Sequence, residues 1–211
     1  MKTANRQDEI VLKELEKRVW QDISRARASH AVLQQFLKPL NKKTSSHYGY
    51  RDVPLTAAIA HAAVHSIISA LGRLLQPNPR DRESTISKYR NGVVKLLGKH
   101  TAPPGKSAHS IQSFNQLSSR DLIATLKREQ KKFTEEILPL RNSLVAHSDI
   151  DFEWSLFERA EKFIMPCIEF VEKVHRTCRS AQQDAGNPGP YLDSRFESVA
   201  QDWIEALQAR K

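Results

Sequence analysis

Hydrophobic residues recur along most of this chain at spacings of three, four and seven, which is the pattern of an amphipathic α-helix. Six segments show the pattern and are expected to be helices: 6–37, 54–75, 84–97, 118–147, 152–181 and 194–209. Apolar and polar residues nowhere alternate over a run long enough to indicate a strand. The sequence therefore predicts an all-α protein, built as a helical bundle with short additional segments.

Proline and serine residues suggest where some of these helices begin or bend. Residues 98–118 contain Pro103-Pro104-Gly105 and are expected to form a long loop. Ser118 or Ser119 then suits the N-cap of the next helix, because its hydroxyl can accept a hydrogen bond from a free N–H of the first turn. Pro139 and Pro166 lie inside predicted helices, where we expect a kink or a break.

The helical segments divide the chain into a bundle and an appended helix. We expect residues 1–182 to form the bundle, 183–193 a linker, and 194–211 an amphipathic helix that packs on the bundle or on a partner. The segment 54–75 is apolar on nearly every side, so it is expected to be the central and most buried helix. His61, His65 and other polar residues interrupt it, and no apolar run approaches the ~20 residues of a membrane span.

The net charge and the cysteine positions indicate the kind of partner and the cellular compartment. The 211 residues carry a net charge of +9, which favours a polyanionic partner because binding to nucleic acid gains from phosphate neutralisation. The first residues show no apolar signal core. Cys167 and Cys178 lie eleven residues apart on one predicted helix, or about 16 Å, which is too far for a disulfide. Free thiols fit a reducing compartment, so we expect a cytoplasmic protein that does not enter a membrane.

The strongest candidate for chemistry is the segment Arg141-Asn142-Ser143-Leu144-Val145-Ala146-His147. Arginine can stabilise the negative charge of a pentacoordinate phosphate. Histidine can take the proton from a 2′-hydroxyl or give one to the leaving oxygen. Asparagine can orient either group by hydrogen bonding. These residue types support cleavage of RNA without a metal ion or other cofactor.

The six-residue separation of Arg141 and His147 does not place them on the same side of a helix. On a regular helix Arg141 and His147 would point about 120° apart. The long arginine side chain compensates in part, and unwinding near His147 would bring the two closer. A second copy of the segment, supplied by a two-fold dimer, would do the same.

The segment resembles the signature of the HEPN superfamily, in which an arginine and a polar residue precede a histidine by four to six positions. The wider context is similar to the abortive-infection, AbiU-type branch of that superfamily. The residues that carry this similarity are Ser69-Ala70-Leu71-Gly72-Arg73-Leu74-Leu75, Thr85-Ile86-Ser87-Lys88-Tyr89 and the downstream Leu140–Asp149 string. The resemblance spans roughly residues 12–179 and does not cover the C-terminal helix.

The resemblance implies an all-α, four-helix up-down bundle with extra N- and C-terminal helical segments, which dimerises around the motif. It also implies a metal-independent endoribonuclease of phage defence or of a toxin–antitoxin system, whose partner would be an antitoxin or regulatory protein. Arg141, Asn142 and His147 would be the catalytic residues. A toxin subset carries a modifiable tyrosine two positions after the histidine. Asp149 stands there in this chain, so silencing by that modification is not expected.

Other interpretations remain open. The protein could be a non-catalytic HEPN module that binds RNA, nucleotide or protein in its dimer groove, or a helical interaction protein whose motif is coincidental.

His61 and His65 have a chelating spacing but are read as ordinary helix residues, without a metal. Loop residues His47–Arg51 could stack on bases. Lys127, Arg128, Lys131 and Lys132 are read as a solvated helix face that could also track RNA towards Arg141.

Overall fold

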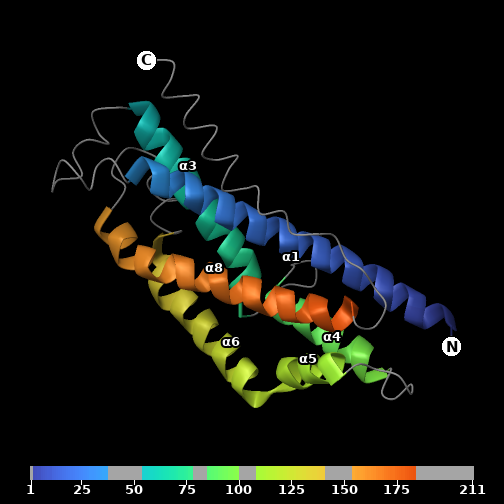
Figure 1. Ribbon diagram of the computed structural model, residues 1–211. Helices are drawn as coiled ribbons and strands as arrows, with labels where there is room; N and C mark the ends of the chain where they lie inside the picture. Colours follow the sequence, from blue (N-terminus) through green and yellow to red (C-terminus); the bar gives the residue numbers. More distant parts are fainter. Residues whose placement is uncertain (1, 38–53, 78–84, 100–107, 141–153, 184–211) are drawn as a thin grey trace.

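The computed structural model of this protein describes residues 2–37, 54–77, 85–99, 108–140 and 154–183 (Figure 1). Within these ranges the chain is helical and has no strand, which confirms the predicted all-α class. The elements are α1 (Lys2–Leu37), α3 (Pro54–Leu75), α4 (Ile86–Lys99), α5 (Ala108–Ser118), α6 (Arg120–Lys132), η2 (Phe133–Ile137) and α8 (Trp154–Gln183).

The first two long helices, α1 and α3, pack side by side and run in opposite directions (Figure 1). The hydroxyls of Ser29 and Ser66 are 2.9 Å apart. Further towards the start of α1, Arg73 donates from Nε and Nη2 to the carboxylate of Asp22, at 3.0 and 2.7 Å. The Asp22 side chain is only 8% exposed. A guanidinium fork on a nearly buried carboxylate fixes the angle and register of two neighbouring helices.

Helix α8 also runs antiparallel to α1. Gln34 donates to Glu161 at 2.8 Å near one end of the pair, and the rings of Trp20 and His175 stack nearer the other. Helix α8 packs against α1, α3, α4, α5 and η2. Helix α3, which was expected to be the central and most buried helix, packs against α1, α4, η2 and α8, and its Val64, Ile67 and Leu71 are fully buried. The centre of the described fold is therefore shared by α3 and α8.

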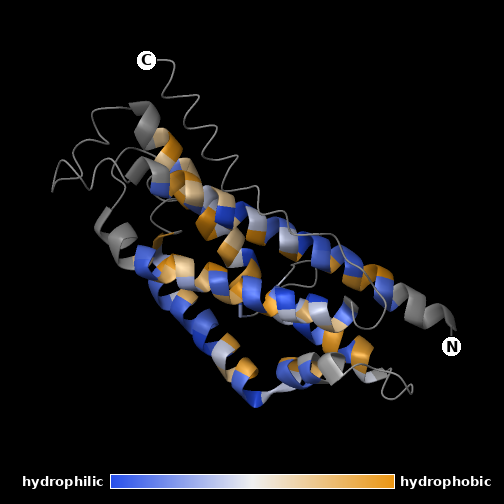
Figure 2. Ribbon diagram, in the orientation of Figure 1, coloured by the Kyte–Doolittle hydropathy of each residue, from blue (hydrophilic) through white to orange (hydrophobic). Residues whose placement is uncertain are grey.

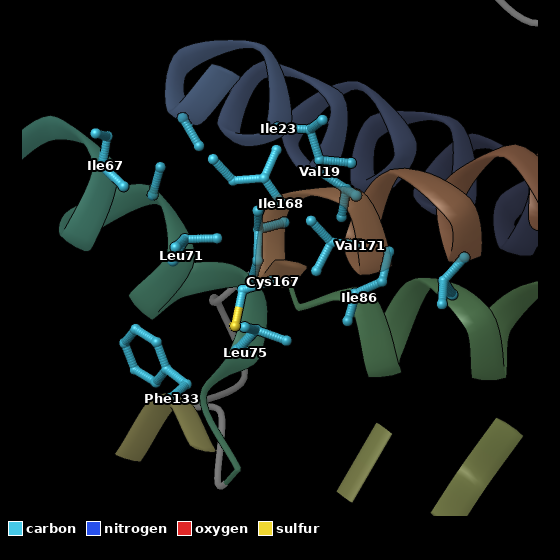
Figure 3. Close-up of a cluster of buried hydrophobic side chains, with 14 of the residues drawn as sticks. Val19, Ile23, Ile67, Leu71, Leu75, Ile86, Phe133, Cys167, Ile168 and Val171 are labelled. Atoms are coloured by element: carbon cyan, nitrogen blue, oxygen red, sulfur yellow. The ribbon is translucent and has the colours of Figure 1, made fainter. Parts of the chain in front are cut away.

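The main core lies where α1, α3, α4, η2 and α8 meet (Figure 3). Each element contributes large side chains that are at most 2% exposed: Val19, Ile23, Ile67, Leu71, Leu75, Ile86, Phe133, Cys167, Ile168 and Val171. Burying one large aliphatic side chain contributes roughly 1.5–3 kcal/mol. The pattern of three, four and seven that predicted the helices is the pattern of residues that face this core.

One stretch within the described residues, Ala58–Leu75 of α3, is long and apolar enough to cross a membrane by length and composition. Half of it is buried inside the fold, against α1 and other helices. Burial of this kind is also typical of a core helix in a soluble protein.

Helix α5 lies within residues 98–118, which were predicted to form a loop. Its sequence is rich in serine, and among its described side chains Leu117 is fully buried. The helix packs on α8 and α4, and Arg90 of α4 donates from Nε to the carbonyl oxygen of Leu117 at 2.7 Å. Tertiary packing and this bond to a C-terminal carbonyl stabilise a segment whose own helix propensity is weak.

The next helix begins where the sequence indicated. Ser119 is the N-cap of α6, and its hydroxyl accepts a hydrogen bond from the backbone N–H of Leu122 at 3.2 Å. Pro166 lies inside α8, which continues through it from Trp154 to Gln183. A proline there removes one backbone hydrogen bond, and the many packing contacts of α8 keep the helix continuous.

Candidate functional site

The predicted catalytic residues Arg141, Asn142 and His147 lie outside the described residues. The structure places the elements on either side of them: the helix of α6 and η2 continues to Leu140, and α8 begins at Trp154. The distance between Arg141 and His147, and their arrangement in any dimer, therefore stay predictions. The described residues define the helix that leads to the motif.

The end of this helix is anchored in the core. Phe133, Ile137 and Leu140 are each at most 2% exposed, and η2 packs against both α3 and α8. A methyl group built on Gly72 of α3 would lie 3.5 Å from Cζ of Phe133, at ordinary van der Waals distance, so the phenyl ring lies beside α3 at this glycine. The helix end before Arg141 is thus buried at Leu140, and the turn that precedes it packs against two helices.

A single π-helical turn, η2, sits just before the motif. The N–H of Leu138 bonds to the carbonyl oxygen of Phe133, five residues earlier. Pro139 explains the turn, because proline lacks an N–H and its ring conflicts with the carbonyl four residues earlier. The wider turn accommodates the ring without ending the helix, which continues to Leu140. Single π-helical turns often occur near functional sites.

Helix α6 carries a basic surface that we define as Lys127, Arg128 and Lys131. All three are exposed, with the Arg128 and Lys131 side chains 65% and 74% accessible. Glu129, between them in sequence, is buried with its side chain 7% exposed and accepts a 2.9 Å bond from Lys132. Arg128 also lies 3.5 Å from Glu129, and Lys131 pairs with the exposed Glu135 at 3.7 Å. Basic side chains still outnumber acidic ones on the outward face of α6.

The two histidines of α3 do not form a recognisable metal site. His61 is partly buried and His65 is exposed. No group of three or more histidine, cysteine or acidic side chains within the described ranges could hold a metal ion. The aromatic and basic loop segment His47–Arg51 lies outside those ranges.

A buried polar cluster, which sequence reasoning missed, lies where α1, α4 and α8 meet. We call it the His175 cluster and define it as Glu16, Trp20, Tyr89, His175 and Gln182. The His175 ring stacks between Trp20 and Tyr89, with centroid distances of 5.7 and 5.5 Å. Gln182 donates to the Tyr89 hydroxyl at 2.9 Å. His175 is 2% exposed, and neither ring nitrogen has a hydrogen-bond partner among the described residues.

Burial controls the ionisation of this cluster. It lowers the pKa of His175 to about 4, and the positive charges of Arg179 and Arg176 act in the same direction. Burial raises the pKa of Glu16, although Arg179 and a hydrogen bond with Tyr89 oppose that shift. Burial likewise raises the pKa of Tyr89. His175 is consequently neutral at physiological pH, and its contacts join α1, α4 and α8.

The sequence held a weak signal for this cluster. Glu16 falls between Leu12 and Val19 on the apolar stripe of α1, and His175 follows Val171 and Val174 on α8. A polar residue on a core-facing stripe indicates a buried polar contact. The stripe does not identify the partner, which comes from a distant part of the chain.

Comparison with protein-family models, with curated proteins and with solved structures finds no match to this chain.

Proposed function

We propose that this protein is a metal-independent endoribonuclease of the HEPN type, acting as a homodimer in phage defence or in a toxin–antitoxin system. The observation that carries the proposal is the string Arg141-Asn142-(four residues)-His147, which directly follows Leu140. Leu140 is the buried end of a helix packed against α3 and α8 through η2. Catalysis requires its groups to be held in a fixed geometry, and an anchored helix end is a suitable support.

Two further observations support an RNA substrate. The net charge of the chain is +9, and the basic surface of α6 lies on the same continuous helix that leads towards Arg141. Cations along such a helix would bind successive phosphates and would do so without regard to base sequence.

The proposed reaction is attack of a ribose 2′-oxygen on the adjacent phosphorus. His147 would remove the proton from the 2′-hydroxyl, and Arg141 would stabilise the negative charge that develops on the pentacoordinate phosphate. The 5′-oxygen leaves with a proton, which His147 of the partner subunit would provide. Asn142 would orient the phosphate or the imidazole. The products are a 2′,3′-cyclic phosphate and a 5′-hydroxyl.

The proposal is tested by incubating RNA with the protein in excess EDTA. We expect cleavage by the wild type and a loss of about 10²–10⁴-fold for His147→Ala, which is the usual contribution of general acid–base catalysis. His65→Ala, at an exposed position on α3, is the matched control and should cut normally. Circular dichroism and sedimentation should show that all three proteins are folded and in the same oligomeric state. Cleavage that survives His147→Ala, or that requires a divalent ion, contradicts the mechanism.

The basic surface of α6 gives a second, separate test. Lys127→Glu should weaken RNA binding at every sequence and lower the slope of log affinity against log salt by about 1 or more. Lys173→Glu, at an exposed position of α8, controls for the change in total charge. Binding that depends on Lys127 without any cleavage by the wild type would favour the non-catalytic RNA-binding module instead.

A further inference from the structure

The outward side of the N-terminal half of α1 combines hydrophobic and basic residues. Towards the bundle, α1 presents Leu12 and Val19, which are 5% and 0% exposed. Away from it lie Ile10 and Val11, which are 54% and 58% exposed and are the exposed large hydrophobic side chains of the described residues. Figure 2 shows hydrophobic positions on this part of α1, next to its grey end. These two neighbouring side chains leave apolar surface that a packed partner would remove from water.

Basic residues accompany this apolar pair. Lys13, Lys17 and Arg18 are all exposed on the same half of the helix. Glu14 lies among them and its carboxylate is paired with Arg18 at 3.2 Å, so these two charges offset each other and Lys13 and Lys17 make the face basic. We define Ile10, Val11, Lys13, Lys17 and Arg18 as the outer face of α1. An amphipathic partner with acidic flanks would complement this face.

We propose that the C-terminal segment 194–209 of the same chain packs as a helix on the outer face of α1. The sequence predicts an amphipathic helix there. Phe196, Val199, Trp203 and Leu207 are spaced to share one side of it, and Glu197, Asp202 and Glu205 are its acidic residues. Residues 184–211 hold five acidic and three basic side chains, in a chain whose net charge is +9. The segment is therefore acidic where the outer face of α1 is basic.

Chain connectivity favours this occupant over a separate protein. Gln182 bonds to Tyr89 beside Glu16 of α1, so α8 ends close to the N-terminal half of α1 (Figure 1). Ten residues, 184–193, then precede the predicted helix and can span up to ~33 Å. The distance along α1 from Glu16 to Val11 is only about 7.5 Å. A short tether also gives the segment an effective concentration in the millimolar range.

The length of the predicted C-terminal helix also matches that of the α1 segment it would cover. The predicted helix of 16 residues would be about 24 Å long, and α1 from Ile10 to Arg25 has the same number of residues. Packing of Trp203 and Val199 over Ile10 and Val11 would withdraw all four side chains from water. The cost of association is small because the two helices belong to one chain.

The proposal is tested by measuring how fast a maleimide reacts with Val11→Cys in the full-length protein. Cys167 and Cys178 are buried and do not compete. We expect the introduced thiol to react about tenfold more slowly than Lys173→Cys, a reference thiol on the exposed side of α8; tenfold corresponds to ~1.4 kcal/mol of protection. Adding Trp203→Asp should restore fast labelling of Val11→Cys and leave Lys173→Cys unchanged. Helix content measured by circular dichroism controls for folding.

A second experiment tests whether the helix that covers the outer face of α1 comes from the same chain or from a second copy of the protein. A bis-maleimide is added to a protein that carries both Val11→Cys and Val199→Cys, and in parallel to a mixture of the two single variants. Crosslinking within one chain, and none between chains in the mixture, is expected. Crosslinked dimers in the mixture would assign the helix to the partner subunit and overturn the proposal. Equal labelling rates of Val11→Cys with and without Trp203→Asp would overturn it as well.

Discussion

Replacing His175 by phenylalanine should stabilise the protein, and the gain should grow as the solution becomes acidic. The phenyl ring keeps the stacking position between Trp20 and Tyr89. It also removes two buried ring nitrogens that have no hydrogen-bond partner within the described residues. A buried polar group without a partner costs about 1–3 kcal/mol, so we expect His175→Phe to gain about 1 kcal/mol or more at pH 7.5.

The acid dependence follows from the lowered pKa of His175. Its pKa falls from the ordinary value of 6.5 to about 4 in the folded protein. Between these two pH values the unfolded chain binds a proton at His175 and the folded protein does not, so the wild type loses stability as pH falls through this window. The difference of roughly 2.5 pH units corresponds to on the order of 3 kcal/mol. His175→Phe lacks this loss, so its advantage should widen from pH 7 to pH 4.

Urea unfolding followed by circular dichroism at pH 7.5, 6.5, 5.5 and 4.5 measures the free energy of unfolding of both proteins. The raised pKa of Glu16 has the opposite effect, because the folded protein then binds a proton at Glu16 more readily than the unfolded chain does. That effect is present in both proteins and cancels in their difference. His65→Phe, at an exposed position on α3, controls for exchanging a histidine for a phenylalanine. A difference that stays constant with pH, or a less stable His175→Phe, would refute the reasoning.

Two glycines and two cysteines give the remaining predictions. Gly72→Ala should raise the free energy of unfolding by about 0.5–1 kcal/mol, because alanine favours a helix and its methyl group has room. Gly92→Ala should gain less or lose stability, because its methyl group would lie 2.8 Å from Cδ1 of Leu12; urea unfolding compares the two, and equal gains would contradict the packing argument. Burial raises the pKa of both thiols, that of Cys167 to about 12, so a disulfide reagent at pH 8 should titrate Cys167 and Cys178 only after unfolding. Fast reaction of the native protein would show that α8 opens readily.

The sequence was sufficient to predict the helices that face a core on one stripe. The segments 6–37, 54–75 and 152–181 coincide closely with α1, α3 and α8, because each places large apolar residues every three or four positions. Ser119 was one of two predicted N-caps, and it is the one that bonds to Leu122. Helix periodicity and N-caps depend on residues that are close together in the sequence, so the sequence alone is enough to predict them.

Features that depend on distant residues were not predictable in the same way. Helix α5 needs its contacts with α8 and the bond from Arg90, 27 residues away from Leu117. The His175 cluster joins Tyr89 to Gln182, which are 93 residues apart. Sequence periodicity reports which side of a helix is apolar, but not which helix will cover it. The motif at Arg141 differs from both kinds of feature. Its residue types predict a chemical function, but the motif lies outside the described residues, so its geometry stays a prediction.

The pairing of α1 with α8 has a consequence for how the chain folds. The contacts that join them close long loops: Gln34 and Glu161 are 127 residues apart, and Arg27 and Met165 are 138 apart. Helical bundles usually fold fast because most of their contacts are local. Here the apolar stripe of α1 is synthesised first and obtains its α8 partner only when the last long helix of the bundle has emerged. A nascent or truncated chain without α8 would leave the sides of α1 and α3 that face it exposed, and is the form of this protein most prone to aggregation.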